Sequence, residues 1–335
     1  IFMDTPIVDF VKAYAQSDKA RFHMPGHKGV SFFGCESLDI TEIKGADVLF
    51  EADGIIAEGE KNASQLFGTA ATFFSAGGST LCIQAMLAAA CGKERAFICA
   101  RNAHRAVMNT SVLLGLEPCW VYPEYEDGSV VSGNITARAV EDAILKYENQ
   151  KPACVFITSP DYLGRLAPVK EIAEVCHKHG LPLLVDNAHG AYLAFLEENL
   201  HPIALGADMC CDSAHKTLPA LTGAAYLHLS RAVAPRFASE ARQMMALFGS
   251  TSLGVEENIP VAPHKWNIHL IAHNPLAGIV CPLAGLLILQ VKVKPLCRAV
   301  ALFGSVAGGV GDEFRAWLGN ALGCVTIGAL GHSGE

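Results

Sequence analysis

Several signatures of well-known enzyme classes are missing from this sequence. It contains no Gly-x-Ser-x-Gly elbow, which argues against an α/β-hydrolase. No Gly-x-Gly-x-x-Gly opens a helix after the first expected strand, which argues against a nicotinamide-dependent dehydrogenase. No Cys-x-x-Cys pair occurs among the 12 cysteines, which lie in apolar runs such as those around Cys99 and Cys154. We interpret these cysteines as small buried side chains of a reduced, cytoplasmic protein.

Positive charge is also scarce. Lys and Arg number 25 against 33 Asp and Glu, and no cluster of basic residues occurs. Proteins that bind nucleic acid or anionic membrane surfaces usually present a basic face, so neither partner is expected. The first residues carry Asp4, Asp9 and Lys12 and do not resemble a signal peptide, which also favours a cytoplasmic location.

The middle of the chain alternates strand-like and helix-like segments. Apolar runs of strand length occupy 95–100, 117–122, 153–158, 181–186, 207–212 and 224–229. Helical segments are expected at 79–90, at 136–147 with Thr136 as N-cap, at 169–179 closed by Gly180, and at 230–247. This alternation predicts an α/β fold, a mainly parallel sheet with helices on both faces. Ligands of such sheets bind at the C-terminal ends of the strands.

Two charged residues stand at expected strand ends. Lys216 follows the strand 207–212, where an amine between His215 and Thr217 is suited to forming a Schiff base. Asp186 ends the strand 181–186, and an isolated carboxylate there needs a positive partner such as a protonated pyridine nitrogen. The alternatives are a solvated lysine in a loop and an aspartate that caps the next turn.

Two weaker signals precede them in the chain. Gly78, Ser79 and Thr80 open the Ala-rich helix, where small residues, hydroxyls and a helix N-terminus suit a phosphate. His104 follows the strand 95–100, where a flat imidazole can stack on an aromatic cofactor. An ordinary N-cap and a surface histidine are the alternatives. Phosphate site, stacking histidine, aspartate and lysine follow one another at strand ends or helix starts, which predicts a site for pyridoxal 5′-phosphate (PLP).

Metal binding is not expected. Two histidine pairs, His23 with His27 and His269 with His273, have the i,i+4 spacing of a helical metal site. Pro25 prevents a helix in the first pair, and the second lacks the glutamate of zinc proteases.

The last part of the chain has a different composition. Residues 253–335 hold 10 charged residues, against 48 in 1–252, and 266–291 hold none. Three interpretations remain open for the uncharged run: a membrane span, which several Asn, His and Pro residues oppose; a buried helix-and-loop segment; and, favoured here, a tail altered by truncation or a shifted reading frame. The expected division is an N-terminal arm (1–60), a PLP-binding large domain (61–252) and an atypical C-terminal segment (253–335).

Six segments resemble the bacterial Orn/Lys/Arg decarboxylase family of fold-type I PLP enzymes. The resemblance covers about residues 4–252, and the start of the chain looks like the short form of the family, without an added N-terminal domain. The segments are 21–29 (RFHMPGHKG), 39–47 (DITE followed by GAD), 68–80, 101–104 (RNAH), 185–190 (VDNAHG) and 213–222 (SAHKTLPALT).

The resemblance implies a role for each candidate. Lys216 would carry PLP, Asp186 would hold the pyridine nitrogen, His104 would stack on the ring, and His189 would lie near ring and substrate. The phosphate would be surrounded by Gly78, Ser79, Thr80, Ser213 and His215, and Ser250 would reach a phosphate across the interface of a homodimer with shared active sites.

The implied activity is decarboxylation of arginine, lysine or ornithine to the corresponding amine, with Lys216 or His215 as the general acid. The residues do not select among the three substrates. Two alternatives stay open: another fold-type I activity such as an aminotransferase, and a catalytically impaired or truncated paralogue that binds PLP without turnover.

Overall fold

A computed structural model describes residues 3–32, 34–125 and 133–250 of this chain. The chain divides into two units, 1–282 and 283–335, and all of the described residues lie in the first. Predictions on residues 253–335 therefore fall outside the described residues, and the proposed division into three segments stays a prediction. Among the described residues, no helix combines the length and apolar character that a membrane span needs.

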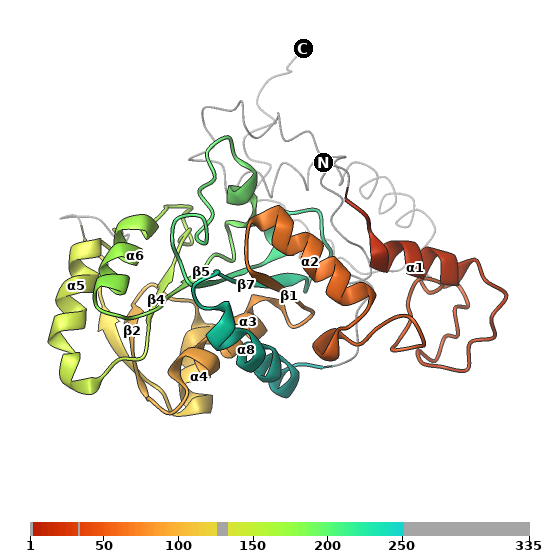
Figure 1. Ribbon diagram of the computed structural model, residues 1–335, viewed down its shortest axis with the longest axis horizontal. Coiled ribbons are helices and arrows are strands. Elements are labelled where there is room, and N and C mark those ends of the chain that lie inside the picture. The colour runs from red at the N-terminus through yellow and green to blue at the C-terminus, as the bar shows by residue number, and fades with distance from the viewer. Residues whose placement is uncertain (1–2, 33, 126–132, 251–335) are drawn as a thin grey trace, which may run out of the picture. The chain divides into compact units, whose positions relative to one another are not determined.

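The described part of the chain is built around a seven-stranded sheet (Figure 1). The order of the strands is β1-β7-β6-β5-β4-β2-β3. Their bounds are β1 Ala71–Ser75, β2 Ala96–Ala100, β3 Glu117–Val121, β4 Val155–Thr158, β5 Leu183–Asp186, β6 Met209–Asp212 and β7 Ala225–Leu229.

The prediction of a mainly parallel α/β sheet is confirmed. β3, β2, β4, β5 and β6 pair in parallel, whereas β7 is antiparallel to both of its neighbours, β6 and β1. Because two reversals separate them, β1 points the same way as β6. β1 is not among the predicted strands, because its sequence, Ala-Thr-Phe-Phe-Ser, is not a continuous apolar run.

Helices cover both faces of the sheet (Figure 1). α3 contacts β1, β5, β6 and β7, and α8 packs on α3, whereas α5 and α6 contact β2, β3 and β5. The α-helices are α1 Pro6–Ala15, α2 Ile55–Phe67, α3 Gly78–Cys91, α4 Arg105–Leu114, α5 Ala137–Lys146, α6 Val169–Lys178, α7 Ala214–Thr217 and α8 Ala234–Phe248, with 3-10 turns at Leu49–Glu51, Glu148–Gln150 and Ala191–Phe195.

Alternation along the strands divides the buried side chains into two cores. In β2, Phe97 and Cys99 belong to the core beneath α3 and α8, while Ile98 belongs to the core beneath α5 and α6. Successive side chains of a strand point to opposite faces, so a continuous apolar run fills both cores at once. Eight of the nine described cysteines are buried and all nine are free, as their apolar surroundings predicted.

The predicted helices are found, with small differences at their ends. The Thr136 side chain accepts a hydrogen bond from the Ala139 amide and caps α5 as predicted. Gly180 has a left-handed φ of 71° just past the end of α6. α8 was predicted from residue 230 but begins at Ala234, because Pro235, which lacks an amide hydrogen, suits only the first turn of a helix.

Candidate active site

The candidate residues meet at one edge of the sheet. β4, β5 and β6 are parallel and end at Thr158, Asp186 and Asp212, and in the sheet Thr158 lies beside Asp186. β1, which points the same way, ends at Ser75 just before α3. The N-terminus of α3 therefore lies at the edge where Asp186 and the loop to Lys216 emerge.

Asp186 lies at the floor of this edge. Its side chain is buried, and it forms no ion pair with any residue in the described part of the chain. Burial raises the pKa of the Asp186 carboxyl, and the hydrogen bond from the Ala188 amide and the charges of Lys216, His104 and His189 oppose this rise. These groups lie close enough to act on Asp186, so the structure gathers the four residues that the sequence placed at three separate strand ends.

Lys216 and His189 are in direct contact. Lys216 lies on the short helix α7 after β6, and its Nζ is 3.1 Å from His189 Nε2. Burial and the neighbouring Lys216 charge lower the pKa of His189, which keeps its imidazole neutral and able to accept a hydrogen bond from Nζ. The Lys216 side chain is exposed at this edge.

Hydroxyl and amide groups gather at the start of α3. Ser213 Oγ donates to Ser79 Oγ at 2.9 Å, which joins the loop after β6 to the first turn of α3. Gly78 has a left-handed φ of 65°, and its amide donates to the Gly223 carbonyl oxygen. The first turn of a helix presents amides without intrahelical partners, so this corner suits an anion. Thr80 is exposed beside it.

The remaining candidates have additional structural contacts. His104 is exposed and its Nδ1 accepts from the Ala106 amide, so it also caps α4. His215 Nδ1 lies 3.0 Å from the Ala224 carbonyl oxygen, which leaves Nε2 for another partner. Ser250 lies exposed two residues past the end of α8, and a single chain does not test its predicted contact with a second subunit.

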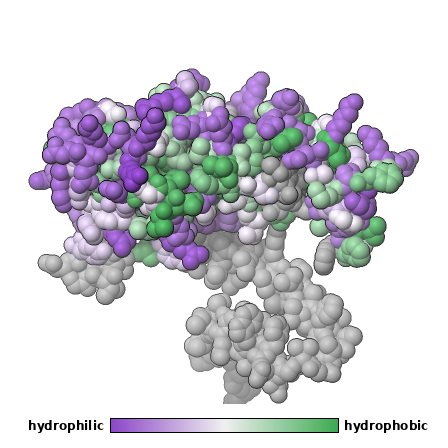
Figure 2. All heavy atoms as spheres, turned by 90° about the horizontal axis from the view of Figure 1, so that it is seen from below, coloured by the Kyte–Doolittle hydropathy of each residue, from purple (hydrophilic) through white to green (hydrophobic). Residues whose placement is uncertain are grey.

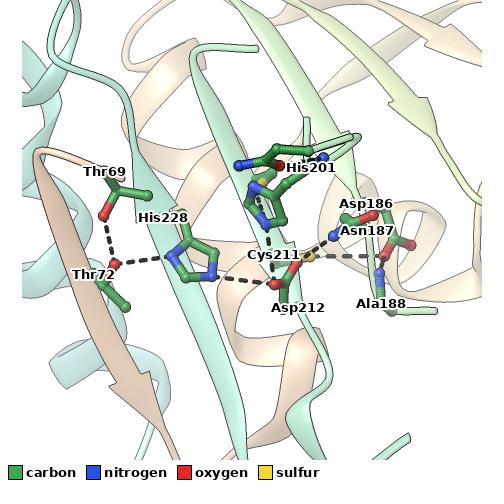
Figure 3. A network of polar contacts seen from close by, with 11 residues as sticks. Thr69, Thr72, Asp186, Asn187, Ala188, His201, Cys211, Asp212 and His228 are labelled. Carbon is green, nitrogen blue, oxygen red and sulfur yellow. Dashed lines mark hydrogen bonds and ion pairs between the residues drawn. The ribbon is translucent and has the colours of Figure 1, made fainter. Parts of the chain in front are cut away.

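A buried polar network, which the sequence patterns did not single out, lies behind the site (Figure 3). The Asp212 carboxylate is contacted by Asn187 Nδ2 at 2.6 Å, by His201 Nε2 at 3.1 Å and by His228 Nε2 at 3.2 Å. All four side chains are fully or almost fully buried. Two signals could have revealed it: an aspartate as the last residue of a buried strand, and a histidine inside the apolar strand 224–229.

The residues fit PLP. The buried Asp186 lacks a paired cation among the described residues, and a protonated pyridine nitrogen would supply one. Two buried polar atoms at this edge, Thr158 Oγ1 and Thr217 Oγ1, have no hydrogen-bond partner within the described residues. Such atoms normally find partners, and a polar ligand or water beside them would supply one.

This sheet, with its antiparallel β7 and a lysine just after β6, is the fold of fold-type I PLP-dependent enzymes. Lysine decarboxylase A from Pseudomonas aeruginosa has the same fold, with a TM-score of 0.66 and 20% sequence identity over 79% of this chain and 41% of that chain. The model of the Orn/Lys/Arg decarboxylase major domain matches residues 5–255. The chain therefore belongs to the Orn/Lys/Arg decarboxylase family, and the predicted extent of the resemblance is confirmed.

Two curated relatives match a similar stretch. YaaO from Bacillus subtilis (strain 168), which is itself uncharacterized, is 33% identical over 68% of this chain and 49% of its own length. The arginine decarboxylase of Halalkalibacterium halodurans is 35% identical over 67% of this chain and 48% of its own length. This chain thus spans about half the length of the curated relatives it matches.

Proposed function

We propose that the protein binds PLP through Lys216 and decarboxylates a basic amino acid, with arginine as the preferred substrate. The observation that carries the proposal is the gathering of Lys216, His189 and the buried Asp186 at one strand edge, beside the hydroxyls of Ser79 and Ser213. The choice of arginine is supported by the curated name of the relative from Halalkalibacterium halodurans.

Each residue has a defined task in this proposal. Asp186 places negative charge at the pyridine nitrogen, and Ser79, Ser213 and His215 hold the phosphate with the first turn of α3. His104 covers one face of the ring. Bound PLP supplies the electron sink that makes loss of the carboxylate feasible. Lys216 Nζ, in contact with neutral His189, then delivers a proton to the substrate Cα.

A homodimer that shares its active sites is part of the same proposal. The helix α4 exposes Met108, Val112 and Leu113, with Val112 82% exposed. Figure 2 looks at the side where α4 and α8 lie in Figure 1 and shows apolar patches among hydrophilic surface. His104 directly precedes α4, so a second copy packed on this helix would lie next to the site.

Reduction and product analysis test the proposal. After reduction of the PLP-loaded protein with borohydride, peptide mapping should find the pyridoxyl group on Lys216, and Lys216→Ala should take no label. Lys178→Ala is the matched control, since Lys178 is exposed and pairs with Glu141. Label on another lysine contradicts the assignment. Incubation with arginine, lysine and ornithine should release carbon dioxide and most amine from arginine, and labelled protein without amine formation would instead indicate an impaired paralogue.

A further inference from the structure

We propose that Asp212 is a positioning residue of the active site, whose buried carboxylate holds, through Asn187, the turn that carries Asp186 and His189. This inference rests on the proposed PLP site. It concerns a side chain that does not touch the cofactor or substrate, and it explains why an aspartate is buried behind the cofactor-binding edge.

The carboxylate of Asp212 has a full set of partners (Figure 3). Its Oδ1 accepts from Asn187 Nδ2, and its Oδ2 accepts from Nε2 of His201 and of His228. Burial alone would raise the pKa of Asp212, but the two imidazoles hold it below its usual value, so Asp212 stays ionised. A buried carboxylate with three donors is a rigid acceptor, because moving any partner would leave a buried charge under-solvated.

The direction of the hydrogen bonds can be followed to the far edge of the sheet. Burial lowers the pKa of His228, so its imidazole is neutral and carries one hydrogen. That hydrogen is on Nε2, facing Asp212, so Nδ1 accepts from Thr72 Oγ1 at 2.9 Å. Thr72 in turn accepts from Thr69 Oγ1 at 2.7 Å. The donor and acceptor roles along this row of hydrogen bonds, from β1 to β6, thus depend on an acceptor at position 212.

Asn187 transmits this order to the site. It lies between Asp186 and Ala188, whose amide donates to Asp186 Oδ1 at 3.1 Å. The Asn187 carbonyl accepts from the Gly190 amide, and a Cβ atom at position 190 would collide with Asn187 Oδ1. The turn 186–190 therefore has little freedom once Asn187 Nδ2 is held. Asp212 also directly precedes Ser213, so one carboxylate joins the loops that follow β5 and β6.

Asparagine cannot replace Asp212 without a rearrangement of this network. An Asn side chain has one acceptor oxygen and one NH2 group. If its oxygen faces the two histidine Nε2 hydrogens, its NH2 meets Asn187 Nδ2, and Asn187 must turn its amide over to accept, which places its own NH2 where Oδ1 now lies beside Gly190. Asp212→Asn is nearly equal in size to the wild-type side chain but should therefore disturb the turn at Asn187.

Asp208 offers a matched control at the other end of β6. It is also buried, and its Oδ2 accepts from His177 Nε2 and from the Leu183 amide, both at 2.8 Å. Asp208 directly precedes β6 and shares with Asp212 the burial and a histidine partner, but it lies away from the cofactor-binding edge.

The experiment compares the two asparagine variants. PLP affinity and the visible circular dichroism of bound PLP, which reports its fixed orientation, are measured together with the melting temperature of the PLP-free proteins. We expect Asp212→Asn to weaken PLP binding at least tenfold and to reduce the dichroism of the bound fraction. Asp208→Asn should lower the melting temperature but leave both cofactor signals unchanged. Equal cofactor effects in the two variants, or none in Asp212→Asn, overturn the proposal.

Asn187→Ala covers the case in which Asp212→Asn does not fold. It removes the link to the turn and leaves Asp212 with its two histidines, and it should reproduce the loss of dichroism.

His201, Cys210 and Asp212 also offer three ligand atoms within 4.8 Å of one another, so stoichiometric zinc in the purified wild type would overturn the hydrogen-bond role. Wild-type protein without borohydride label on Lys216 refutes the proposed function, whereas labelled wild type with unchanged variants refutes this inference alone.

Discussion

Asp186 is suited to a ligand at a cost to the stability of the PLP-free protein. Its carboxylate is buried, and burial raises its pKa despite the nearby Lys216 and histidines. A carboxyl whose pKa is higher in the folded than in the unfolded state binds more protons when folded, so stability falls as pH rises through the interval between the two values. The positive charge of a protonated pyridine would offset this loss, which couples folding to cofactor binding.

Asp186→Asn should separate these two effects. Without PLP at pH 8, the variant should unfold with a free energy about 1 kcal/mol higher than wild type, because a buried charge is removed. The difference should vanish as pH falls below the usual aspartate pKa of 3.8, where the wild-type carboxyl is protonated in both states. With PLP and arginine the variant should lose most decarboxylation. Chemical denaturation across pH measures the first effect, and equal stability at pH 8 would contradict it.

Among the elements, α2 has an unusual N-terminal cap. Gly54 precedes the helix and has no side chain, and Asp47, seven residues earlier, takes over the capping. The Asp47 carboxylate accepts from five backbone amides, those of Val48, Asp53, Gly54, Ile56 and Ala57. Burial would raise the pKa of Asp47, but these amides together lower it. The ionised form therefore holds the loop 47–57 together.

Asp47→Ala should destabilise the protein by about 1–2 kcal/mol at neutral pH, in the range of lost helix caps. A carboxyl whose pKa is lowered on folding stabilises above its unfolded pKa, so the difference between variant and wild type should shrink as pH falls below 3.8. Glu51→Ala is the control, because Glu51 is an exposed carboxylate in the same loop and its loss should change stability by less than about 0.5 kcal/mol. Equal effects of both substitutions would show that the cap has no special role.

At the scale of the whole molecule, the exposed apolar side chains of α4 and the predicted role of Ser250 both concern a second copy of the chain. A single chain holds Lys216, Asp186 and the start of α3 at one edge, whereas Ser250 lies past the end of α8. If Ser250 completes the phosphate site of a partner, neither subunit is fully active alone.

Mixed dimers test this arrangement. Lys216→Ala and a disabling Ser250 variant should each be inactive. Random pairing of equal amounts makes half of the dimers mixed, and each mixed dimer has one intact site of two. Co-refolding the two variants should therefore restore up to about a quarter of the wild-type activity. Lys216→Ala mixed with Asp186→Ala is the control, since both residues lie at the same edge of one chain. A mixed dimer of these two variants would have an intact site only if the Lys216 and Asp186 of one site came from different subunits. Full activity in a preparation that light scattering shows to be monomeric would refute the sharing of active sites between subunits.

Single segments of the sequence are enough to predict the local chemistry of this protein. Apolar runs ending in a charged residue marked β5 and the edge where Asp186 lies, and the glycines and hydroxyls at 77–80 marked the start of α3. Such features can be recognised from single segments, because strand length, helix capping and the chemistry of a side chain are properties of neighbouring residues. The specific segments 21–29 and 213–222 supplied the family.

Contacts between distant residues, in contrast, follow from the assembled fold. β7 runs antiparallel because it follows a short loop after α7. The apolar pattern of a strand does not predict whether it runs parallel or antiparallel to its neighbours. The network of Thr72, Asn187, His201, Asp212 and His228 draws on residues up to 156 positions apart, and no single segment shows which of them will meet. Burial gives these contacts their strength, since it removes the water that would otherwise compete for every hydrogen bond. Burial and pairing across the sheet arise only when the strands assemble.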